Sequence, residues 1–328
     1  MNPNIPSTMQ ASVYLRYGGP EVLHVTDVPT PTPMPAQMLV RIHAAAVNRT
    51  DTGFRTGMPI ITRFFSGLFR PKCNILGSEF AGEVVAIGAE VTKFAVGDRV
   101  FGVNANGFST HAQYACINED APVALMPSTV TFEEAASVSD GVVLALTNLR
   151  RGELTEGQRI LIYGASGSIG TAGVQLAKHM GAHVTAVCAT DQVGLVRSLG
   201  ADEVIDRTER DFTAIGETYD IVFDAVGKSS FRKCRRLLVK RGKYLSTDLG
   251  FLWQNPLLWL VTSRLPIKRA YLPVPTYRKA EVEQLRDLLE AGDYRPVIDR
   301  TYTLEQVVEA NRYVDSQAKI GNVVLIID

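Results

Sequence analysis

A glycine-rich turn near the middle of the chain has residue types that could hold a phosphate group. It follows the apolar segment Ile160 to Tyr163 and opens a stretch, Ser168 to Met180, whose apolar residues recur at helical spacing. Strand, glycine turn and helix in this order are typical of dinucleotide binding, because glycines let the backbone approach a pyrophosphate and the helix amino terminus offers unpaired N–H groups. An ordinary tight turn is the alternative, and the flanking strand and helix favour a nucleotide site. The expected cradle comprises Gly164, Ala165, Ser166, Gly167, Ser168, Ile169 and Gly170, with Ala165 at the place of the first fingerprint glycine.

The residue after the next strand indicates which nicotinamide cofactor is expected. An NAD enzyme places an acidic residue there for the ribose 2′-hydroxyl, whereas this chain has Cys188. A 2′-phosphate is therefore tolerated, and Thr190 can donate to it, although Asp191 is an unfavourable neighbouring charge. Arg207 could supply the missing cation, or it could be a solvated loop arginine beside Asp206. We predict NADPH as the cofactor.

Alternating short strands and helices from about residue 131 onward predict a doubly wound parallel sheet, because apolar strands between helices are typically covered on both faces. A helix is expected from Phe231 to Lys240 between two of these strands. The expected strands are Ile160 to Tyr163, Val184 to Val187, Val204 to Ile205, Ile221 to Asp224 and Tyr244 to Ser246, and the other helices are Ser168 to Met180 and Gln192 to Leu199.

The first 125 residues read instead as short strands separated by turns. The expected strands are Ser12 to Arg16, Met38 to Ala46, Phe80 to Ile87, Asp98 to Gly102 and His111 to Cys116. Helices are expected again at Lys279 to Ala291 and Leu304 to Ser316, followed by a strand at Asn322 to Ile327. With no linker visible, this carboxyl-terminal part could rejoin the first domain.

The overall composition bounds what the protein can do. A length of 328 residues suggests about two domains, and equal numbers of basic and acidic residues, 34 each, leave no electrostatic footprint for nucleic acid. The amino terminus, Met1 to Gln10, has neither the basic start nor the apolar stretch of a secretory signal, so a cytoplasmic location is the expectation. The four cysteines are scattered and form neither a disulfide framework nor a metal cluster, so we interpret them as reduced thiols.

Several ordered motifs resemble the medium-chain dehydrogenase/reductase superfamily, specifically its zinc-independent, zeta-crystallin-like quinone oxidoreductase branch. The motifs are Ala44 to Asp51, Leu76 to Val84, Val96 to Gly102, the glycine turn and Gly321 to Val324, so the resemblance runs nearly end to end. It implies a GroES-like β-rich catalytic domain at residues 1–130, completed by 272–328, and a Rossmann domain at 131–271. It also implies a cleft between them and a homodimer.

The resemblance adds further residues on the cofactor side. It places Val226 and Gly227, which follow a strand, under the nicotinamide ribose, and Ser246 ends the next strand. Ligands of open parallel sheets lie at the carboxyl ends of the strands, which gives these placements a topological reason. Asn322, in the last motif, completes the expected cofactor contacts.

Zinc enzymes of this superfamily take their ligands from places that here hold Asn48, Ser78 and Asp140. Asn, Ser and Asp do not supply the thiolate and imidazole set of a tetrahedral catalytic zinc, and the four-cysteine structural lobe is absent too. We therefore expect no metal. His43 and His111 are interpreted as strand or loop histidines.

What remains is hydride transfer between the nicotinamide and an electron-poor acceptor. The resemblance places Asn48, which could hydrogen-bond a carbonyl or the ribose, and Asp51, which could order its loop, beside the nicotinamide; both could equally be local backbone caps. Tyrosines of related quinone reductases are replaced by Gly53 and Pro59, and a threonine that faces the nicotinamide by Leu144. These losses weaken an enoyl-thioester reductase interpretation and leave solvent as the proton donor, which suits quinones and enones.

Two apolar segments are expected to shape the acceptor site, Met58 to Phe69 and Leu249 to Ser263. Core or dimer contacts are alternatives, as is shallow membrane contact through the flanking basic residues, while Pro256 and the short length exclude a spanning helix. A dense basic run between Arg232 and Lys243 is interpreted as a solvated surface.

These features favour an NADPH-dependent quinone or enone reductase that works without zinc. An NADPH-binding protein with a structural or regulatory role and little turnover is the alternative, and zinc-dependent alcohol oxidation is the least favoured hypothesis.

Overall fold

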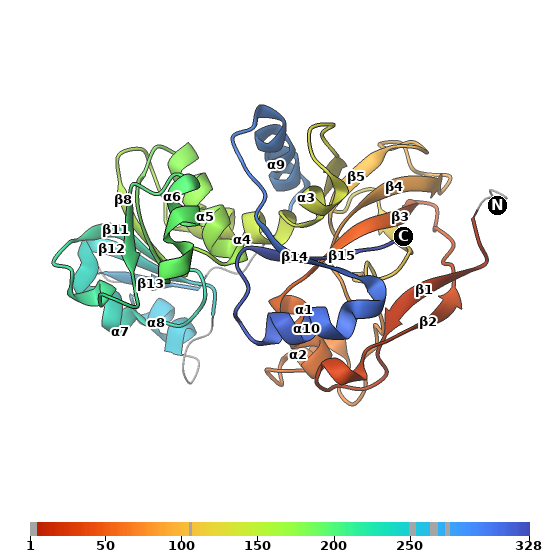
Figure 1. The fold of residues 1–328 in the computed structure, drawn as a ribbon, viewed down its shortest axis with the longest axis horizontal. Coiled ribbons are helices and arrows are strands. Elements are labelled where there is room, and N and C mark those ends of the chain that lie inside the picture. Colours follow the sequence, from red (N-terminus) through yellow and green to blue (C-terminus); the bar gives the residue numbers. More distant parts are fainter. Residues whose placement is uncertain (1–4, 105–106, 249–253, 263–267, 273–275) are drawn as a thin grey trace. The chain divides into compact units, whose positions relative to one another are not determined.

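The computed structural model describes residues 5–104, 107–248, 254–262, 268–272 and 276–328. These residues form two compact units (Figure 1), the first made of residues 1–139, 277–292 and 296–328 and the second of residues 140–276 and 293–295. The carboxyl-terminal part thus returns to the amino-terminal unit. The predicted domain boundaries were 130/131 and 271/272, and the divisions between the compact units lie a few residues further along.

Unit 1 is built on a mostly antiparallel seven-stranded sheet, in the order β14-β15-β3-β4-β5-β7 with β6 also paired to β3, beside a two-stranded β1-β2 ribbon. Its central strand β3 is buried along most of its length and ends at the residue before Asn48. The strands are β1 (Thr8–Val13), β2 (His24–Pro29), β3 (Gln37–Val47), β4 (Glu79–Ile87), β5 (Arg99–Val103), β6 (Tyr114–Asn118), β7 (Val123–Leu125), β14 (Ile298–Thr303) and β15 (Asn322–Ile326).

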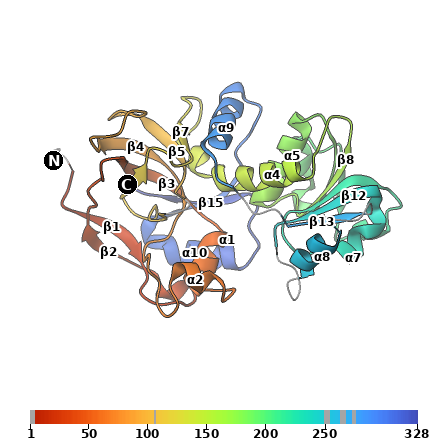
Figure 2. The same cartoon turned by 180° about the vertical axis from the view of Figure 1, so that it is seen from behind.

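Short helices cover this sheet and close its core. Helices α1 and α10 lie side by side in both views (Figures 1 and 2), and apolar residues of α10 join strand residues in one buried cluster. The helices of unit 1 are α1 (Arg49–Thr56), α2 (Thr62–Ser66), α3 (Phe132–Ala136), α9 (Lys279–Ala291) and α10 (Val307–Asp315).

Unit 2 is a six-stranded, fully parallel sheet in the order β10-β9-β8-β11-β12-β13. Its central strands β8, β9 and β11 are almost continuously buried, as expected for a parallel sheet with helices on its faces. The strand order reverses between β8 and β11, which is where an open α/β sheet opens a crevice for a ligand. The strands are β8 (Arg159–Tyr163), β9 (His183–Cys188), β10 (Glu203–Asp206), β11 (Tyr219–Asp224), β12 (Leu238–Ser246) and β13 (Arg269–Tyr271), and the helices are α4 (Ser139–Arg151), α5 (Ser168–His179), α6 (Val193–Ser198), α7 (Phe231–Cys234) and α8 (Gln254–Thr262).

The predicted fold class, a β-rich GroES-like domain with a Rossmann-type parallel sheet, is confirmed. The predicted helix Phe231 to Lys240 is wrong. Helix α7 ends at Cys234, a 3₁₀ turn follows, and β12 begins at Leu238, which pairs with Tyr219 of β11. Pairing and burial of this apolar segment override the helix propensity of the basic run around it.

Two predicted strands in unit 1 are misplaced. The strand expected at Ser12 to Arg16 is β1, Thr8–Val13, and the one expected from His111 begins at Tyr114 as β6. Pairing with β2 and β3 sets both boundaries. No helix among the described residues is long and apolar enough to cross a membrane.

Candidate functional site

The glycine turn after β8 is held by its own backbone. The N–H groups of Gly164 and Ala165 both donate to Val187 O of β9 at 3.1 Å, and Gly164 has φ 78°, a left-handed conformation that favours glycine. Gly167 is the N-cap of α5 and supplies no side-chain cap. The first turn of α5 therefore keeps N–H groups that a bound anion can take.

Gly170 and Gly167 have different surroundings, since packing requires a glycine at position 170 and not at position 167. A Cβ on Gly170 would lie 2.1 Å from Gly164 O and 2.7 Å from Ala165 Cα, so Gly170 allows the helix to pack against the turn. A Cβ on Gly167 would meet nothing nearer than 3.7 Å. Packing does not require a glycine there, and the open space beside the amino terminus of α5 is where a pyrophosphate would fit.

Residues that follow four neighbouring strands gather at one edge of the sheet. Cys188 ends β9, Ser246 ends β12, and Val226 and Gly227 follow β11, while the glycine turn follows β8. Val226 is 38% exposed, and its side chain would lie 2.5 Å from a Cβ on Gly164, so the turns after β8 and β11 touch. These predicted cofactor residues lie at the carboxyl ends of the strands on both sides of the switch point.

Asp224, at the end of β11, organises the loop that carries Val226 and Gly227. Its carboxylate accepts hydrogen bonds from Ser229 N at 2.7 Å, from Val226 N at 3.3 Å and from Tyr244 Oη at 3.0 Å. Burial raises the pKa of Asp224, and these donors oppose the shift. The resemblance places the segment Asp224 to Gly227 under the nicotinamide ribose, but the hydrogen-bond partners of Asp224 are set by the fold of the loop and could not be predicted.

The end of β9 has a neutral residue where NAD enzymes have a carboxylate. Cys188 is buried, and burial raises the pKa of its thiol to about 11, so the group is uncharged at neutral pH. Thr190 Oγ1 lies 2.7 Å from Thr208 Oγ1, and side-chain hydrogen bonds from these two threonines lower the pKa of Asp206. The hydroxyl of Thr190 therefore already takes part in hydrogen bonding to the carboxylate of Asp206.

Arg207 lines a hollow of about 330 Å³ together with Tyr163, Thr208, Glu209, Arg210, Asp211 and Phe212. Tyr163 and Phe212 stack with their centroids 4.8 Å apart, and the charge of Arg207 opposes the burial that raises the pKa of Tyr163. Arg210 is a second cation in this hollow that sequence analysis missed. The sequence feature that could have pointed to Arg210 is its position three residues after Arg207 in the same loop.

One side chain ties the glycine turn to the loop after β9. Gln192 Oε1 accepts hydrogen bonds from Ser166 Oγ at 2.6 Å and from Ala189 N at 3.3 Å. The serine of the predicted cradle is thereby oriented by a residue on the next βα turn.

In unit 1, Asn48 and Asp51 form a reciprocal cap at the start of α1. Asn48 Oδ1 accepts from Thr50 N at 2.8 Å and from Asp51 N at 3.3 Å, while Asp51 Oδ2 accepts from Asn48 N at 2.9 Å. Asp51 Oδ1 also accepts from Gly77 N at 3.0 Å. Asn48 Nδ2 donates to the buried Glu79 at 2.9 Å, and its second amide hydrogen has no hydrogen-bond acceptor among the described residues.

The other residues noted for zinc or cofactor contacts lie in separate surroundings. Ser78 is buried in unit 1 and Asp140 is buried in unit 2. Burial lowers the pKa of His43, which stacks on Phe132, and His111 Nε2 lies 2.9 Å from Ala46 O. Among the described residues no cluster of three or more His, Cys, Asp or Glu side chains could hold a metal ion.

Asn322, the last of the predicted cofactor residues, is buried at the start of β15 in unit 1. Its Nδ2 donates to Val297 O at 3.1 Å, as does its backbone N–H at 2.9 Å. Its amide thus anchors a turn of unit 1.

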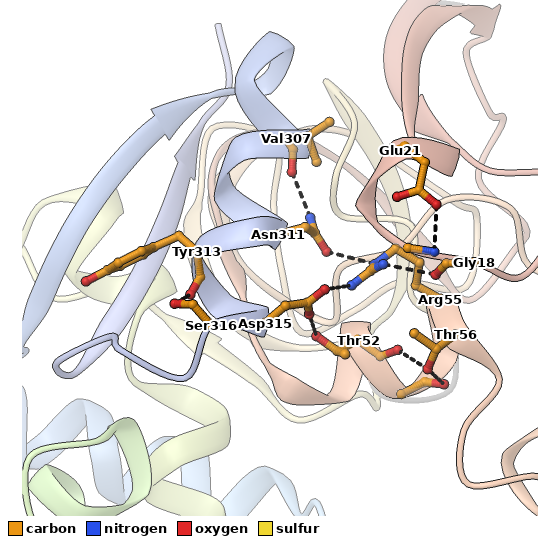
Figure 3. Close-up of polar contacts among 12 residues, drawn as sticks. Gly18, Glu21, Thr52, Arg55, Thr56, Val307, Asn311, Tyr313, Asp315 and Ser316 are labelled. Carbon is orange, nitrogen blue, oxygen red and sulfur yellow. Dashed lines mark hydrogen bonds and ion pairs between the residues drawn. The ribbon is translucent and has the colours of Figure 1, made fainter.

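A buried arginine fixes the helix that Asn48 caps (Figure 3). Arg55, on α1, is fully buried and donates to Asp315 Oδ2 at 2.6 Å, to Gly18 O at 3.0 Å and to Asn311 Oδ1 at 3.3 Å. Thr52 Oγ1 donates to the other oxygen of Asp315 at 2.8 Å. Helices α1 and α10 are therefore locked together at the carboxyl end of α1.

The apolar segment Met58 to Phe69 presents large side chains to solvent. Phe64, Phe65 and Phe69 are 71%, 77% and 86% exposed. The other predicted acceptor segment, Leu249 to Ser263, lies partly outside the described residues; its described part is α8, where Trp259 is 41% exposed.

Comparisons with known proteins match both units. Family models described as "alcohol dehydrogenase GroES-like domain" and "zinc-binding dehydrogenase" match residues 34–148 and 199–325. The chain is 30% identical to a quinone oxidoreductase of Pseudomonas aeruginosa over 95% of this chain and 98% of that protein. It is 29% identical to the chloroplastic NADPH-dependent alkenal/one oxidoreductase of Arabidopsis thaliana, over 98% of this chain and 80% of that protein. The structure of the quinone oxidoreductase from Coxiella burnetii matches with a TM-score of 0.88 at 27% identity, covering 98% of this chain and all of that one.

Proposed function

The chain belongs to the medium-chain dehydrogenase/reductase superfamily, in its quinone oxidoreductase branch, and we propose that it transfers a hydride from NADPH to a quinone or an α,β-unsaturated carbonyl without zinc. The observation that carries the proposal is the glycine turn at the switch point of the parallel sheet, with open space at Gly167 beside the amino terminus of α5. Relatives named for quinone and alkenal/one reduction support the acceptor class.

The residues present fit a nicotinamide dinucleotide. Gly164 through Gly170 would hold the pyrophosphate, and the loop after β11, fixed by Asp224, would meet the ribose on the nicotinamide side. When bound, the cofactor supplies the hydride. Preference for NADPH over NADH is supported by the uncharged Cys188. Arg207 and Arg210 in the adjacent hollow would pair with the 2′-phosphate in competition with Glu209 and Asp211 of the same lining.

In unit 1, Asn48 is the residue we propose at the reacting end. Its remaining amide hydrogen would donate to an acceptor carbonyl, while its other polar contacts keep the side chain fixed on α1. Asp51 acts as a positioning residue through Asn48 N and Gly77 N. The assignment of Asn322 to cofactor binding stays a prediction, since its side chain also bonds Val297 O. A proton needed after hydride transfer comes from solvent in this proposal.

We exclude a catalytic zinc because Asn48, Ser78 and Asp140 stand where zinc enzymes of this superfamily have their metal ligands. Asn48 commits its amide oxygen to two backbone N–H groups, and an amide, a hydroxyl and one carboxylate are poor ligands for a tetrahedral zinc. The test is metal analysis of the purified protein together with the activity before and after dialysis against a chelator. Stoichiometric zinc, or activity lost on chelation and restored by zinc, would overturn this part of the proposal.

We place the apolar acceptor against the segment Met58 to Phe69, whose exposed aromatic rings suit a flat, hydrophobic molecule. Replacing Phe64 and Phe65 by serine should raise KM for an apolar quinone more than for a small water-soluble quinone. Met34→Ser, which removes an equally exposed apolar side chain elsewhere in unit 1, serves as the control. An equal effect of both variants on both quinones would contradict the placement.

The same segment would also serve for shallow membrane contact, because its neighbours Arg70 and Lys72 are exposed and basic. Sedimentation with anionic vesicles tests this role.

Homodimerisation, by pairing of the edge strand β13 with its copy, is a further part of the proposal. Light scattering across a range of concentrations measures it, and a monomer at all concentrations would contradict it. A cytoplasmic location stays a prediction.

Fluorescence titration with NADPH and NADH, followed by steady-state NADPH oxidation with quinones and enones, tests the function. We expect NADPH to bind more tightly than NADH, Arg207→Ala to reduce that preference, and turnover to require an electron-poor acceptor. Equal binding of both cofactors would refute the assignment of the 2′-phosphate site. Tight NADPH binding without turnover for any acceptor would favour a structural or regulatory NADPH-binding protein.

A further inference from the structure

A basic hollow lies on the surface of unit 2, and its lining shares no residue with the glycine turn. It has a volume of about 660 Å³ and combines five cationic side chains with two hydroxyls. Its lining consists of Thr213, Ser230, Arg232, Lys233, Arg235, Arg236 and Lys268. No carboxylate is part of this lining.

Three separate segments bring these residues together. They are the 3₁₀ turn at Phe212–Ala214, the stretch from Ser230 through the end of the turn after α7, and residue 268 just before β13. Arg236 Nη2 donates to Thr213 Oγ1 at 2.8 Å, and Lys268 Nζ donates to Arg235 O at 2.8 Å. Two of the cations are thus oriented by neighbouring groups before any ligand arrives.

The charges in this hollow are not balanced by carboxylates. Within the described part of the chain, none of the five cations forms an ion pair within 4 Å, whereas Arg159 and Lys178 of the same unit pair with Glu217 and Asp202. Two of the cations, Arg236 and Lys233, act on the carboxylate of Asp211. Hydrogen bonds from Thr213 lower the pKa of Asp211, and the charges of Arg236 and Lys233 add to the shift. Asp211 therefore stays ionised, and its single negative charge offsets only part of the five positive charges, so the hollow keeps a net positive charge.

We propose that this hollow binds a ligand carrying two or more phosphate groups, at a site separate from the dinucleotide cradle. A single phosphate would leave most of the cations unneutralised in a volume of this size. Arginine forks match phosphate oxygens in pairs, and the two hydroxyls can donate further hydrogen bonds. Equal numbers of acidic and basic residues in the whole chain make this a local site rather than a general affinity for polyanions.

The site is continuous with the loop that we assign to the cofactor ribose. Ser230, one of its lining residues, follows Gly227 by three residues, and Ser229 N between them donates to Asp224. A ligand that orders Ser230 therefore acts on a segment whose other end faces the dinucleotide site. Binding in the hollow itself does not depend on the proposed hydride transfer.

Isothermal titration with inorganic tripolyphosphate, in the presence of saturating NADPH to keep the glycine turn occupied, tests the proposal. We expect tripolyphosphate to bind and inorganic monophosphate to bind at least about tenfold more weakly, because fewer cations are engaged. The variant Arg232→Gln/Lys233→Gln should weaken tripolyphosphate binding about tenfold, equivalent to about 1.4 kcal/mol. Both side chains are exposed, and an unchanged thermal unfolding transition confirms that the variant folds.

The matched control is Lys240→Gln/Arg241→Gln, which removes the same charge from exposed positions of β12 outside the hollow. It should leave binding within about twofold of the parent, since neither side chain lines the hollow. Equal weakening by both double variants, or no binding of tripolyphosphate, would overturn the proposal.

A second arm of the experiment uses phosphatidylcholine vesicles with and without a phosphatidylinositol bisphosphate. Vesicle binding that depends on Arg232 and Lys233 and exceeds that of tripolyphosphate assigns the phosphates to a lipid headgroup, and the reverse order assigns them to a free ligand.

Discussion

Replacing Arg55 by methionine should destabilise unit 1 strongly while leaving the fold of unit 2 intact. The substitution removes three hydrogen bonds from a fully buried guanidinium and leaves Asn311 Oδ1 and Gly18 O without their donor. The unsatisfied Asn311 Oδ1, which is buried, costs about 1–3 kcal/mol, and Gly18 O, which is half-buried, costs less because water can reach it. Asp315 loses its counter-charge but is 29% exposed and keeps the bond from Thr52, so water offsets part of its loss. Together these contributions amount to about 3–5 kcal/mol, in the range for breaking a buried ion pair.

Hydrogen exchange measured by mass spectrometry is the appropriate assay, because both tryptophans lie between residues 140 and 276 and their fluorescence reports on unit 2. A loss of 3–5 kcal/mol accelerates exchange through opening of α1 and α10 about 100- to 4,000-fold. Peptides from α5, in unit 2, are the internal control and should be unchanged. The double variant Arg55→Met/Asp315→Asn should cost less than the sum of the single variants by about 2 kcal/mol, because it leaves no unpaired charge. Additive costs, or an acceleration below about tenfold, would refute the assignment of the pair as a stabilising lock.

Three further predictions concern the cofactor side. Gly170→Ala should weaken NADPH binding at least about tenfold, because the new Cβ would lie 2.1 Å from Gly164 O. Gly194→Ala, whose new Cβ would meet nothing within 4 Å, should bind NADPH normally. The cofactor titration measures both variants. Asp224→Asn should lower the free energy of unfolding of unit 2 by about 2 kcal/mol and raise KM for NADPH, since one accepting oxygen of a buried carboxylate becomes a donor. Tyr244→Phe, which removes a single donor, should lower the free energy of unfolding by less. Urea unfolding followed by tryptophan fluorescence measures both variants. Dialysis against a chelator should leave the steady-state rate of NADPH oxidation unchanged, and a fall reversed by added zinc would show that the donor-set argument is mistaken.

The cofactor cradle could be predicted from sequence because its determinants are local. A strand, a turn that needs glycine at Gly164 and Gly170, and a helix with apolar residues at helical spacing all lie between residues 159 and 179, and each is dictated by short-range sterics and periodicity. Cys188 could be placed for the same reason, since it ends the strand that follows α5. The sheet order then brings these neighbours to one edge.

Long-range pairing explains what the sequence did not reveal. Nothing near Arg55 distinguishes it from a surface arginine, because its partner Asp315 lies 260 residues further along the chain. The basic run at Arg232 to Lys243 has the composition of a helix, yet Leu238 pairs with Tyr219 and turns its second half into a strand. The hollow of five cations follows from that change, since it ends α7 early and brings Lys268 against the turn that follows.

Asn48 illustrates how one residue carries a structural and a chemical role at once. As an N-cap it satisfies two backbone donors of α1, and α1 is held at its other end by Arg55. A free asparagine side chain would lose rotamer freedom on meeting a carbonyl, whereas this one is already fixed by Thr50 N and by Glu79. The cap therefore pre-organises the amide hydrogen that we assign to the acceptor, and the local structural interpretation of Asn48 supports the functional one.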